Sequence, residues 1–166
     1  MLWLFTTNGS AGMFIIRVIL AIVIFAHGAQ KLLGWFGGQG YTGTIGFFTT
    51  SMGLPWLIAF LVIIGESVGS LSLLAGFLTR FVAASFLLIM LGAIAMVHWP
   101  HGFFMNWFGQ QQGEGFEYHL LIIGMSLALL VEGGGAWSVD QLIARRMTHR
   151  EWSGTQPLHA FAQSKQ

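Results

Sequence analysis

The chain has 166 residues, of which 55% are hydrophobic and only 8% carry a charge. A soluble domain has about 25% charged residues, so this composition excludes a soluble enzyme and a disordered chain and predicts an integral membrane protein. The absence of cysteine excludes disulfides, thiolate metal sites and cysteine nucleophiles. The net charge is +1 and the chain contains no basic tract, which argues against nucleic-acid binding.

Four apolar stretches are long enough to cross a bilayer as helices, which takes about 20 residues. They are residues 12–33, 56–77, 81–99 and 116–131, the last being the shortest. The first stretch resembles the apolar region of a signal peptide, but its apolar run begins at Met13, ahead of Arg17, so we expect a retained helix. We therefore predict an all-α fold, a transmembrane four-helix bundle of residues 1–140, followed by a polar tail of residues 141–166.

The basic residues predict how the helices are oriented. Arg17 lies near the start of the first stretch and Arg80 in the short connection between the second and third, while four more follow the fourth stretch: Arg145, Arg146, Arg150 and Lys165. With four crossings, all of them lie on one side, which the positive-inside rule makes cytoplasmic. Both termini and the tail are then cytoplasmic, and the connections 34–55 and 100–115 face outward.

Small residues recur at the spacing that lets helices approach closely in lipid. Gly65 and Gly69 form a GxxxG pair in the second stretch, and Gly124 with Ala128 offers a similar face in the fourth. We interpret these as helix contacts without chemistry. Because Glu66 adjoins the glycine pair, we expect its side chain to point into the bundle.

Ionisable residues within spans are costly and by default mark a site. Counting depth along each helix places Arg17, Arg80 and Glu132 in a cytoplasmic layer. A structural interpretation suffices for this layer, because arginine side chains reach lipid head groups and Glu132 can pair with one of them.

The outer half of the predicted bundle holds a larger polar set. His27 and Lys31 lie one helical turn apart and share a face, and Glu66 lies deeper in the second span. The third span ends at His98, and the fourth opens with Glu117, Tyr118 and His119. Together, the candidate ligand-binding or proton-handling residues are His27, Lys31, Glu66, Glu117, His119 and His98.

Several chemistries are compatible with this set. A metal site has suitable ligand types, but a dinuclear carboxylate site needs Glu-x-x-His spacing, whereas Glu117 and His119 are two residues apart and point to different faces; we assign no metal. Quinone binding fits, because a histidine donor and a buried acid can hydrogen-bond two carbonyl groups. A solute or proton path and a purely structural polar network remain as alternatives. The chain encodes no Walker loop, dinucleotide fingerprint, HExxH motif or nucleophile elbow.

Taken in chain order, these motifs resemble the DoxX family of small four-helix membrane proteins. The resemblance runs from Arg17 to about Asp140, and its matching elements are Arg17, His27-Gly28-x-x-Lys31-Leu32, Gly46-Phe47, Gly53-x-Pro55, Glu66-x-x-Gly69, Thr79-Arg80 and Glu117. It implies a multi-pass protein of the bacterial inner membrane. Some members of the family are subunits of quinone-linked oxidoreductases, including thiosulfate:quinone oxidoreductase, or join membrane assemblies linked to oxidative stress. The family positions carried over are Arg17, His27, Lys31, Glu66, Arg80 and Glu117.

We therefore expect an integral membrane subunit of a quinone-linked redox assembly, with a polar intramembrane pocket in its outer half. No redox cofactor is encoded, so electrons would come from a membrane or peripheral partner protein, and whether the chain is itself catalytic is left open. Its other partners would be the lipid bilayer and a bound quinone. Assembly with a second copy of the same chain is a further alternative. The alternatives are a structural or assembly protein whose polar core fixes helix register, and a small solute or proton transporter.

Overall fold

The computed structural model describes residues 2–154 and contains only helices and connecting loops within that range. Residues 155–166 of the predicted tail lie outside the described residues. The α-helices are α1 (Ala11–Leu33), α2 (Gly40–Gly46), α3 (Trp56–Ile64), α4 (Ser70–Ala75), α5 (Thr79–Ala93), α6 (Glu117–Glu132) and α7 (Val139–Gly154). Three π-helical segments continue some of them, namely η3 (Phe47–Ser51), η4 (Gly65–Gly69) and η5 (Ile94–His98), and short 3-10 turns are η1 (Leu2–Leu4), η2 (Trp35–Gly37) and η6 (Trp99–His101).

Three of these helical runs are long and apolar enough to cross a membrane. They are Ala11–Leu33, Trp56–Ala75 and Thr79–His101, and they confirm the first three predicted stretches to within two residues at every end. The second run is continuous because η4 joins α3 to α4, and the third because η5 and η6 extend α5. The fourth predicted stretch is helix α6, which has 16 residues. The four-crossing topology stays a prediction.

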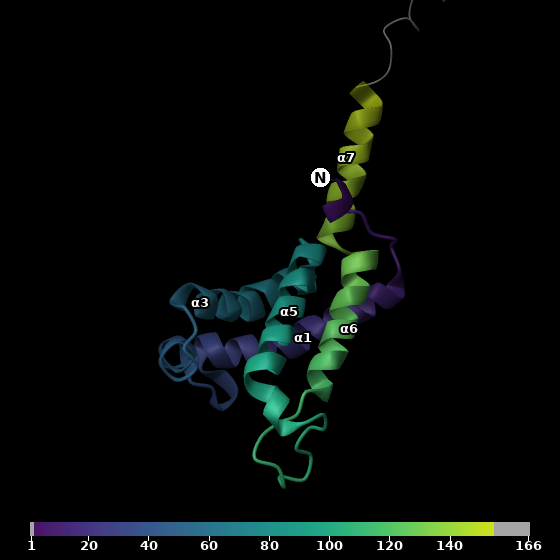
Figure 1. Cartoon of the computed structure of the whole chain (residues 1–166). Helices are drawn as coiled ribbons and strands as arrows, with labels where there is room; N and C mark the ends of the chain where they lie inside the picture. Colours follow the sequence, from purple (N-terminus) through teal and green to yellow (C-terminus); the bar gives the residue numbers. More distant parts are fainter. Residues whose placement is uncertain (1, 155–166) are drawn as a thin grey trace, which may run out of the picture.

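The helices form two pairs that cross each other (Figure 1). In the first pair, α3 and α4 run back along α1, and in the second, α6 runs back along α5. Contacts of α1 with α6, and of α4 and η4 with α5, hold the pairs together. We call the end where α1 begins and α6 ends the inner end, and the opposite end the outer end. The pairs converge at the inner end and diverge toward the outer end (Figure 1).

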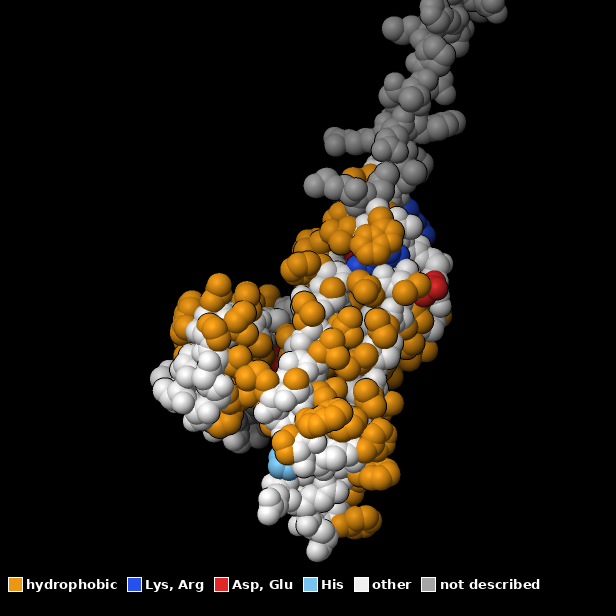
Figure 2. Space-filling view, viewed as in Figure 1, with side chains coloured by type: hydrophobic (Ala, Val, Ile, Leu, Met, Phe, Trp, Pro, Cys, Tyr) orange, Lys and Arg blue, Asp and Glu red, His pale blue; other side chains and the backbone are white. Residues whose placement is uncertain are grey.

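A core of aliphatic and aromatic side chains lies where the pairs cross. Its buried members are Leu20, Ala21 and Ile24 of α1, Leu73 of α4, Val82, Ala83, Phe86 and Met90 of α5, and Ile122 and Leu129 of α6. The surfaces of the same helices that face away from the core are also hydrophobic. Leu88 and Leu121, for example, are 69% and 67% exposed. Hydrophobic side chains cover much of the face seen in Figure 2. A continuous apolar exterior around an apolar core is what a lipid environment requires.

Glycines decide how closely two pairs of elements approach. A Cβ atom added at Gly28 would lie 2.4 Å from the carbonyl oxygen of Glu66, so the backbones of α1 and η4 are in direct contact there. Gly65 and Gly69 instead face α5, where a Cβ on Gly65 would meet the side chain of Ile89 at 3.0 Å. Both observations agree with the predicted role of small residues in helix packing. The expectation for Gly124 was wrong, because it faces open space: a Cβ atom added there would meet nothing within 4 Å.

Candidate functional site

An ion pair joins α1 to the π-helical segment η4. The Lys31 Nζ atom lies 2.5 Å from Glu66 Oε2, and the Lys31 and Glu66 side chains are 23% and 5% exposed. Among the side chains that the structure describes, residues 3–147, it is the only salt bridge. The close approach at Gly28, one turn before Lys31, brings the two side chains within reach. A π-helical turn inserts one extra residue into a helix, and such turns are often found at functional sites.

A second polar group lies on the outer part of the α5–α6 pair. The His98 and His119 rings are 4.0 Å apart, and His98 Nδ1 lies 2.8 Å from the carbonyl oxygen of Glu114. His119 is only 6% exposed. Its Nδ1 atom and the hydroxyl of Tyr118 are buried without a hydrogen-bond partner. Unsatisfied buried polar atoms are rare and costly, so these two call for a partner from outside the chain or for a water molecule.

His27 connects the two groups. Its ring lies 5.8 Å from that of Tyr118, and it interacts electrostatically with Lys31 and Glu66 on one side and with His119 on the other. Glu66 in turn interacts electrostatically with Tyr118. Six side chains from α1, η4, η5 and α6 therefore form one assembly, which we call the outer polar cluster: His27, Lys31, Glu66, His98, Tyr118 and His119.

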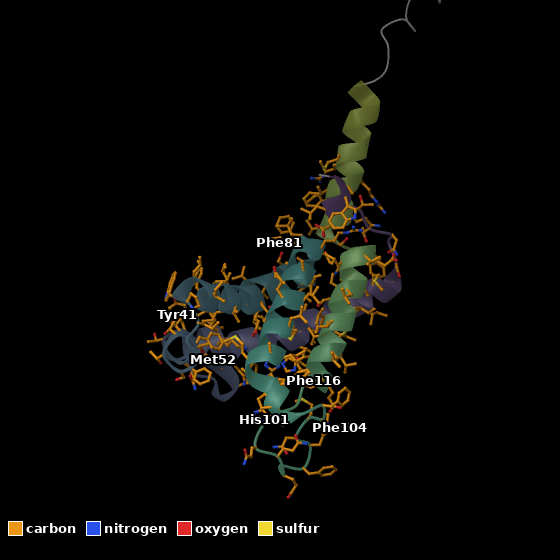
Figure 3. All side chains as sticks on the ribbon, in the orientation of Figure 1. Tyr41, Met52, Phe81, His101, Phe104 and Phe116 are labelled. Atoms are coloured by element: carbon orange, nitrogen blue, oxygen red, sulfur yellow. The ribbon has the colours of Figure 1, made fainter. Side chains whose placement is uncertain are left out.

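The outer polar cluster lies between the two diverging helix pairs. Figure 2 shows a hollow between α3 and α5 with acidic side-chain atoms at its floor. In Figure 3, Tyr41 and Met52 lie beside the outer ends of α1 and α3, while His101 and Phe116 lie at the outer end of the α5–α6 pair. The side chain of His27 is exposed although His119 and Glu66 are buried. Within the cluster, His27 is therefore the member most open to the surroundings of the protein.

The structure does not bring Glu117 into this cluster. Its Oε1 atom accepts hydrogen bonds from the backbone N–H of Met105, at 3.0 Å, and from Trp107 Nε1, at 2.8 Å. Glu117 therefore holds the loop between α5 and α6 rather than facing Glu66. Adjacent residues on a helix point to different faces, which is why Tyr118 and not Glu117 meets His27. Tyr118 was not among the predicted site residues, although its neighbours on both sides were.

Metal binding receives no support from the geometry. Within the described residues, no three histidine, aspartate or glutamate side chains are arranged so that they could hold a metal ion. The rings of His98 and His119 form a close pair, but Glu114 approaches His98 through its carbonyl oxygen and not through its carboxylate.

The three predicted inner-end residues, Arg17, Arg80 and Glu132, join the segment before α1, the start of α1 and the start of α5 to the end of α6 and the loop after it. Arg17 is 1% exposed, and its guanidinium donates to the carbonyl oxygens of Gly134, at 2.6 Å, and Trp137, at 3.1 Å. Arg80 donates to the carbonyl oxygens of Thr6 and Val131. The expectation that these side chains reach lipid head groups was wrong, because both are buried and backbone carbonyl oxygens bind each guanidinium inside the protein.

Glu132 also differs from expectation. Its Oε2 atom accepts a hydrogen bond of 2.5 Å from Asn8 Nδ2, and in the described part of the chain no arginine forms an ion pair with it. A residue that the sequence motifs left unexplained plays a larger part. Asp140 is 1% exposed, and its two carboxylate oxygens accept from the backbone N–H groups of Leu78 and Thr79, each at 2.8 Å, which caps the start of α5.

Comparison with known proteins identifies relatives of this chain. A sequence model of the DoxX family matches residues 12–99. A protein of Bacillus subtilis (strain 168) named "Putative oxidoreductase CatD" is 36% identical over 118 residues, which are 71% of this chain and 78% of that protein. A protein of Escherichia coli (strain K12) named "Inner membrane protein YqjF" is 30% identical over 135 residues, which are 81% of this chain and 94% of that protein. No solved structure matches.

The family match covers α1 through the start of η6 and so includes Arg17, His27, Lys31, Glu66 and Arg80, whereas Glu117 lies beyond it. Helices with membrane-spanning length and composition, a matching family model over more than half of the sequence and two relatives that align over most of it lead to one conclusion. This chain is a membrane protein of the DoxX family.

Proposed function

We propose that this protein is a quinone-binding subunit of a membrane oxidoreductase assembly and that the outer polar cluster holds the quinone ring. The observation that carries the proposal is that a salt-bridged carboxylate and two buried polar atoms without hydrogen-bond partners belong to one cluster, at the opening between the two helix pairs. Glu66 and Lys31 stand on one side, and the Tyr118 hydroxyl and His119 Nδ1 on the other. A quinone has two carbonyl oxygens at opposite ends of a flat ring, so it needs donors from two directions.

The position of the opening supports a lipid-soluble ligand. The helix pairs diverge toward the outer end, and His27, in the outer part of α1, is exposed. A ligand dissolved in the bilayer could enter sideways, whereas a water-soluble one would have to pass the hydrophobic exterior. Aromatic side chains near the opening, including the stacked rings of Trp99 and Phe116, 5.6 Å apart, supply apolar surface.

The chemistry of quinone reduction fits the residues present. Reduction to a quinol consumes two electrons and two protons. Tyr118 would donate a hydrogen bond to one carbonyl oxygen, while Lys31 would neutralise negative charge that develops on the other. Glu66 and His27 would exchange the protons. The electrons would come from a partner protein that carries flavin, haem or metal. The name of the Bacillus subtilis relative, "Putative oxidoreductase CatD", is consistent with this role.

The same proposal includes a location and a topology. We infer that the chain lies in the bacterial inner membrane, as the name of the Escherichia coli relative suggests for that protein. Helix α6 would make the fourth crossing, with both termini cytoplasmic. Its 16 residues extend about 24 Å, less than the hydrocarbon core of about 30 Å, and local thinning of the bilayer can accommodate such a difference.

One observation favours a second role. Glu66 and Lys31 already satisfy each other's charge, which a register-fixing polar core would also require. A purely structural core, however, would leave His119 Nδ1 and the Tyr118 hydroxyl without a function. The two roles differ in whether an organic ligand occupies the opening.

The experiment is to purify the full chain from bacterial membranes in mild detergent and to quantify co-extracted quinone per protein. Glu66→Gln, His27→Ala and Tyr118→Phe should each retain about tenfold less quinone, since losing a hydrogen bond to a buried polar group costs about 1–3 kcal/mol. Glu117→Gln is the matched control, because this carboxylate binds the α5–α6 loop and an amide oxygen can still accept both bonds.

Two results would contradict the proposal. One is a wild-type protein that carries no quinone and takes up none when quinone is added. The other is an equal loss of quinone from Glu117→Gln and Tyr118→Phe, which would mean that the effect is general destabilisation. If Glu66→Gln lowers the unfolding temperature without any quinone being present in the wild type, the structural role is supported instead.

A further inference from the structure

A groove lies at the inner end, far from the outer polar cluster. It has a volume of about 570 Å³ and is formed by Gly9, which precedes α1, by the segment between α6 and α7, and by the first turns of α7. The side chains that matter for its chemistry are Trp137, Gln141, Leu142 and Arg145. No proposed step of quinone chemistry involves any of them.

The groove lies at the level where candidate membrane spans begin. The Trp137 ring packs edge-on against Phe14 in the first turn of α1, with ring centres 4.9 Å apart. The carbonyl oxygen of Trp137 accepts a hydrogen bond from Arg17 one turn further along α1. The segment is therefore fixed beside the end of the span Ala11–Leu33, where hydrocarbon gives way to lipid head groups.

The surface of the groove is both apolar and basic. Trp137 is 74% exposed and Leu142 is 56% exposed, and the exposed Arg145 stands one helical turn after Gln141. Figure 2 shows basic side-chain atoms beside hydrophobic ones at this end of the molecule. Asp140, the acidic residue nearest in sequence, is buried with both oxygens bound to the start of α5, so it does not oppose an anion.

We propose that this groove binds the head group of an anionic glycerophospholipid. Arg145 would hold the phosphodiester through paired, charge-assisted hydrogen bonds, and the Gln141 amide would contact the polar end of the head group. Trp137 and Leu142 would pack on the glycerol and the upper acyl chains, as amphipathic aromatic residues do at the membrane boundary. The ligand is a lipid, because free phosphate would leave the apolar half of the groove uncovered.

The test measures lipid binding one molecule at a time. The full chain in detergent micelles is titrated with phosphatidylglycerol or, separately, phosphatidylcholine, and bound lipids are counted by native mass spectrometry. We expect one phosphatidylglycerol to bind in preference to phosphatidylcholine. Arg145→Gln should weaken this binding about tenfold, since a charge-assisted bond is lost.

Arg146→Gln is the matched control. It removes the same charge from the next residue, which is also exposed but does not line the groove. In micelles there is no charged membrane surface, so diffuse attraction by Arg146 contributes little and binding should stay within about twofold of wild type. Trp137→Ala should weaken binding while the helical circular dichroism signal remains.

Three outcomes would overturn the inference. Equal weakening by Arg145→Gln and Arg146→Gln would indicate unspecific charge attraction. Displacement of the lipid by an equal concentration of inorganic phosphate would indicate a simple anion site. Equal binding of phosphatidylcholine and phosphatidylglycerol would show that the head-group charge is not recognised.

Discussion

At the scale of single residues, the Lys31–Glu66 pair is the clearest feature of this protein. Its atoms are 2.5 Å apart, and the Glu66 side chain is 5% exposed. A charge in this position is stable only while its partner is present, because removing one member leaves the other buried and uncompensated. The pair therefore couples α1 to η4 through charge as well as through packing.

We predict that Lys31→Met destabilises the protein by roughly 3 kcal/mol, since the Glu66 carboxylate is left buried. Glu66→Gln should cost less, because the Lys31 side chain is 23% exposed and its ammonium group can reach polar surroundings. The double variant should lose less unfolding free energy than the two single variants lose in total. Unfolding by dodecyl sulfate in mixed micelles, followed by circular dichroism, measures all four proteins. Strictly additive effects would show that the two side chains do not interact.

At the scale of elements, the decisive contact is that of α1 with the π-helical segment η4. The absence of a side chain at Gly28 allows the two backbones to touch, and a Cβ atom there would lie 2.4 Å from the Glu66 carbonyl oxygen and 2.6 Å from the Ser67 nitrogen. Both of those atoms belong to the backbone and cannot rotate away. The contact sets the depth at which Lys31 meets Glu66.

We predict that Gly28→Ala destabilises the protein by about 2 kcal/mol, the usual cost of inserting a group into a packed interior. Gly124→Ala is the matched control: it is also a helical glycine, but it faces open space, so the better helix propensity of alanine should leave stability unchanged or raise it by up to about 1 kcal/mol. The same mixed-micelle titration serves both. If the two variants behave alike, the α1–η4 contact is not tight.

At the scale of the whole molecule, the bundle is closed at one end and open at the other. Arg17, Arg80 and Asp140 bind backbone groups from distant parts of the chain at the inner end, whereas the outer ends of the two pairs separate. An assembly of this kind is rigid where the chain segments are joined and gives access where they diverge. The hydrophobic exterior of the helices suits a lipid environment.

We predict four crossings with the inner end toward the cytoplasm. The chain contains no cysteine, so a maleimide can label only the single cysteine that is introduced into each variant. Ser51→Cys and Gln110→Cys, on the two outer connections, should react with a membrane-impermeant maleimide in cells whose outer membrane has been permeabilised but whose inner membrane is intact. Met147→Cys, in α7, should react only after the inner membrane is opened. Labelling of Gln110→Cys and Met147→Cys from the same side would mean that α6 does not cross.

Much of this protein follows from local properties of the sequence. The membrane environment and the first three helical runs could be predicted because hydropathy and run length act over about 20 consecutive residues. The candidate residues His27, Lys31, Glu66, His98 and His119 could be named because intramembrane ionisable groups are rare. Their depth along each helix follows from the constant rise per residue.

Only the tertiary structure decided which of these side chains meet. That depends on the rotation of each helix about its axis and on how the pairs cross, and both are set by contacts between residues far apart in sequence, such as Gly28 with Glu66. A rotation of one position separates Tyr118, which faces His27, from Glu117, which binds the loop. The burial of Arg17 likewise required the carbonyl groups of a loop 117 residues away, which no local pattern could indicate.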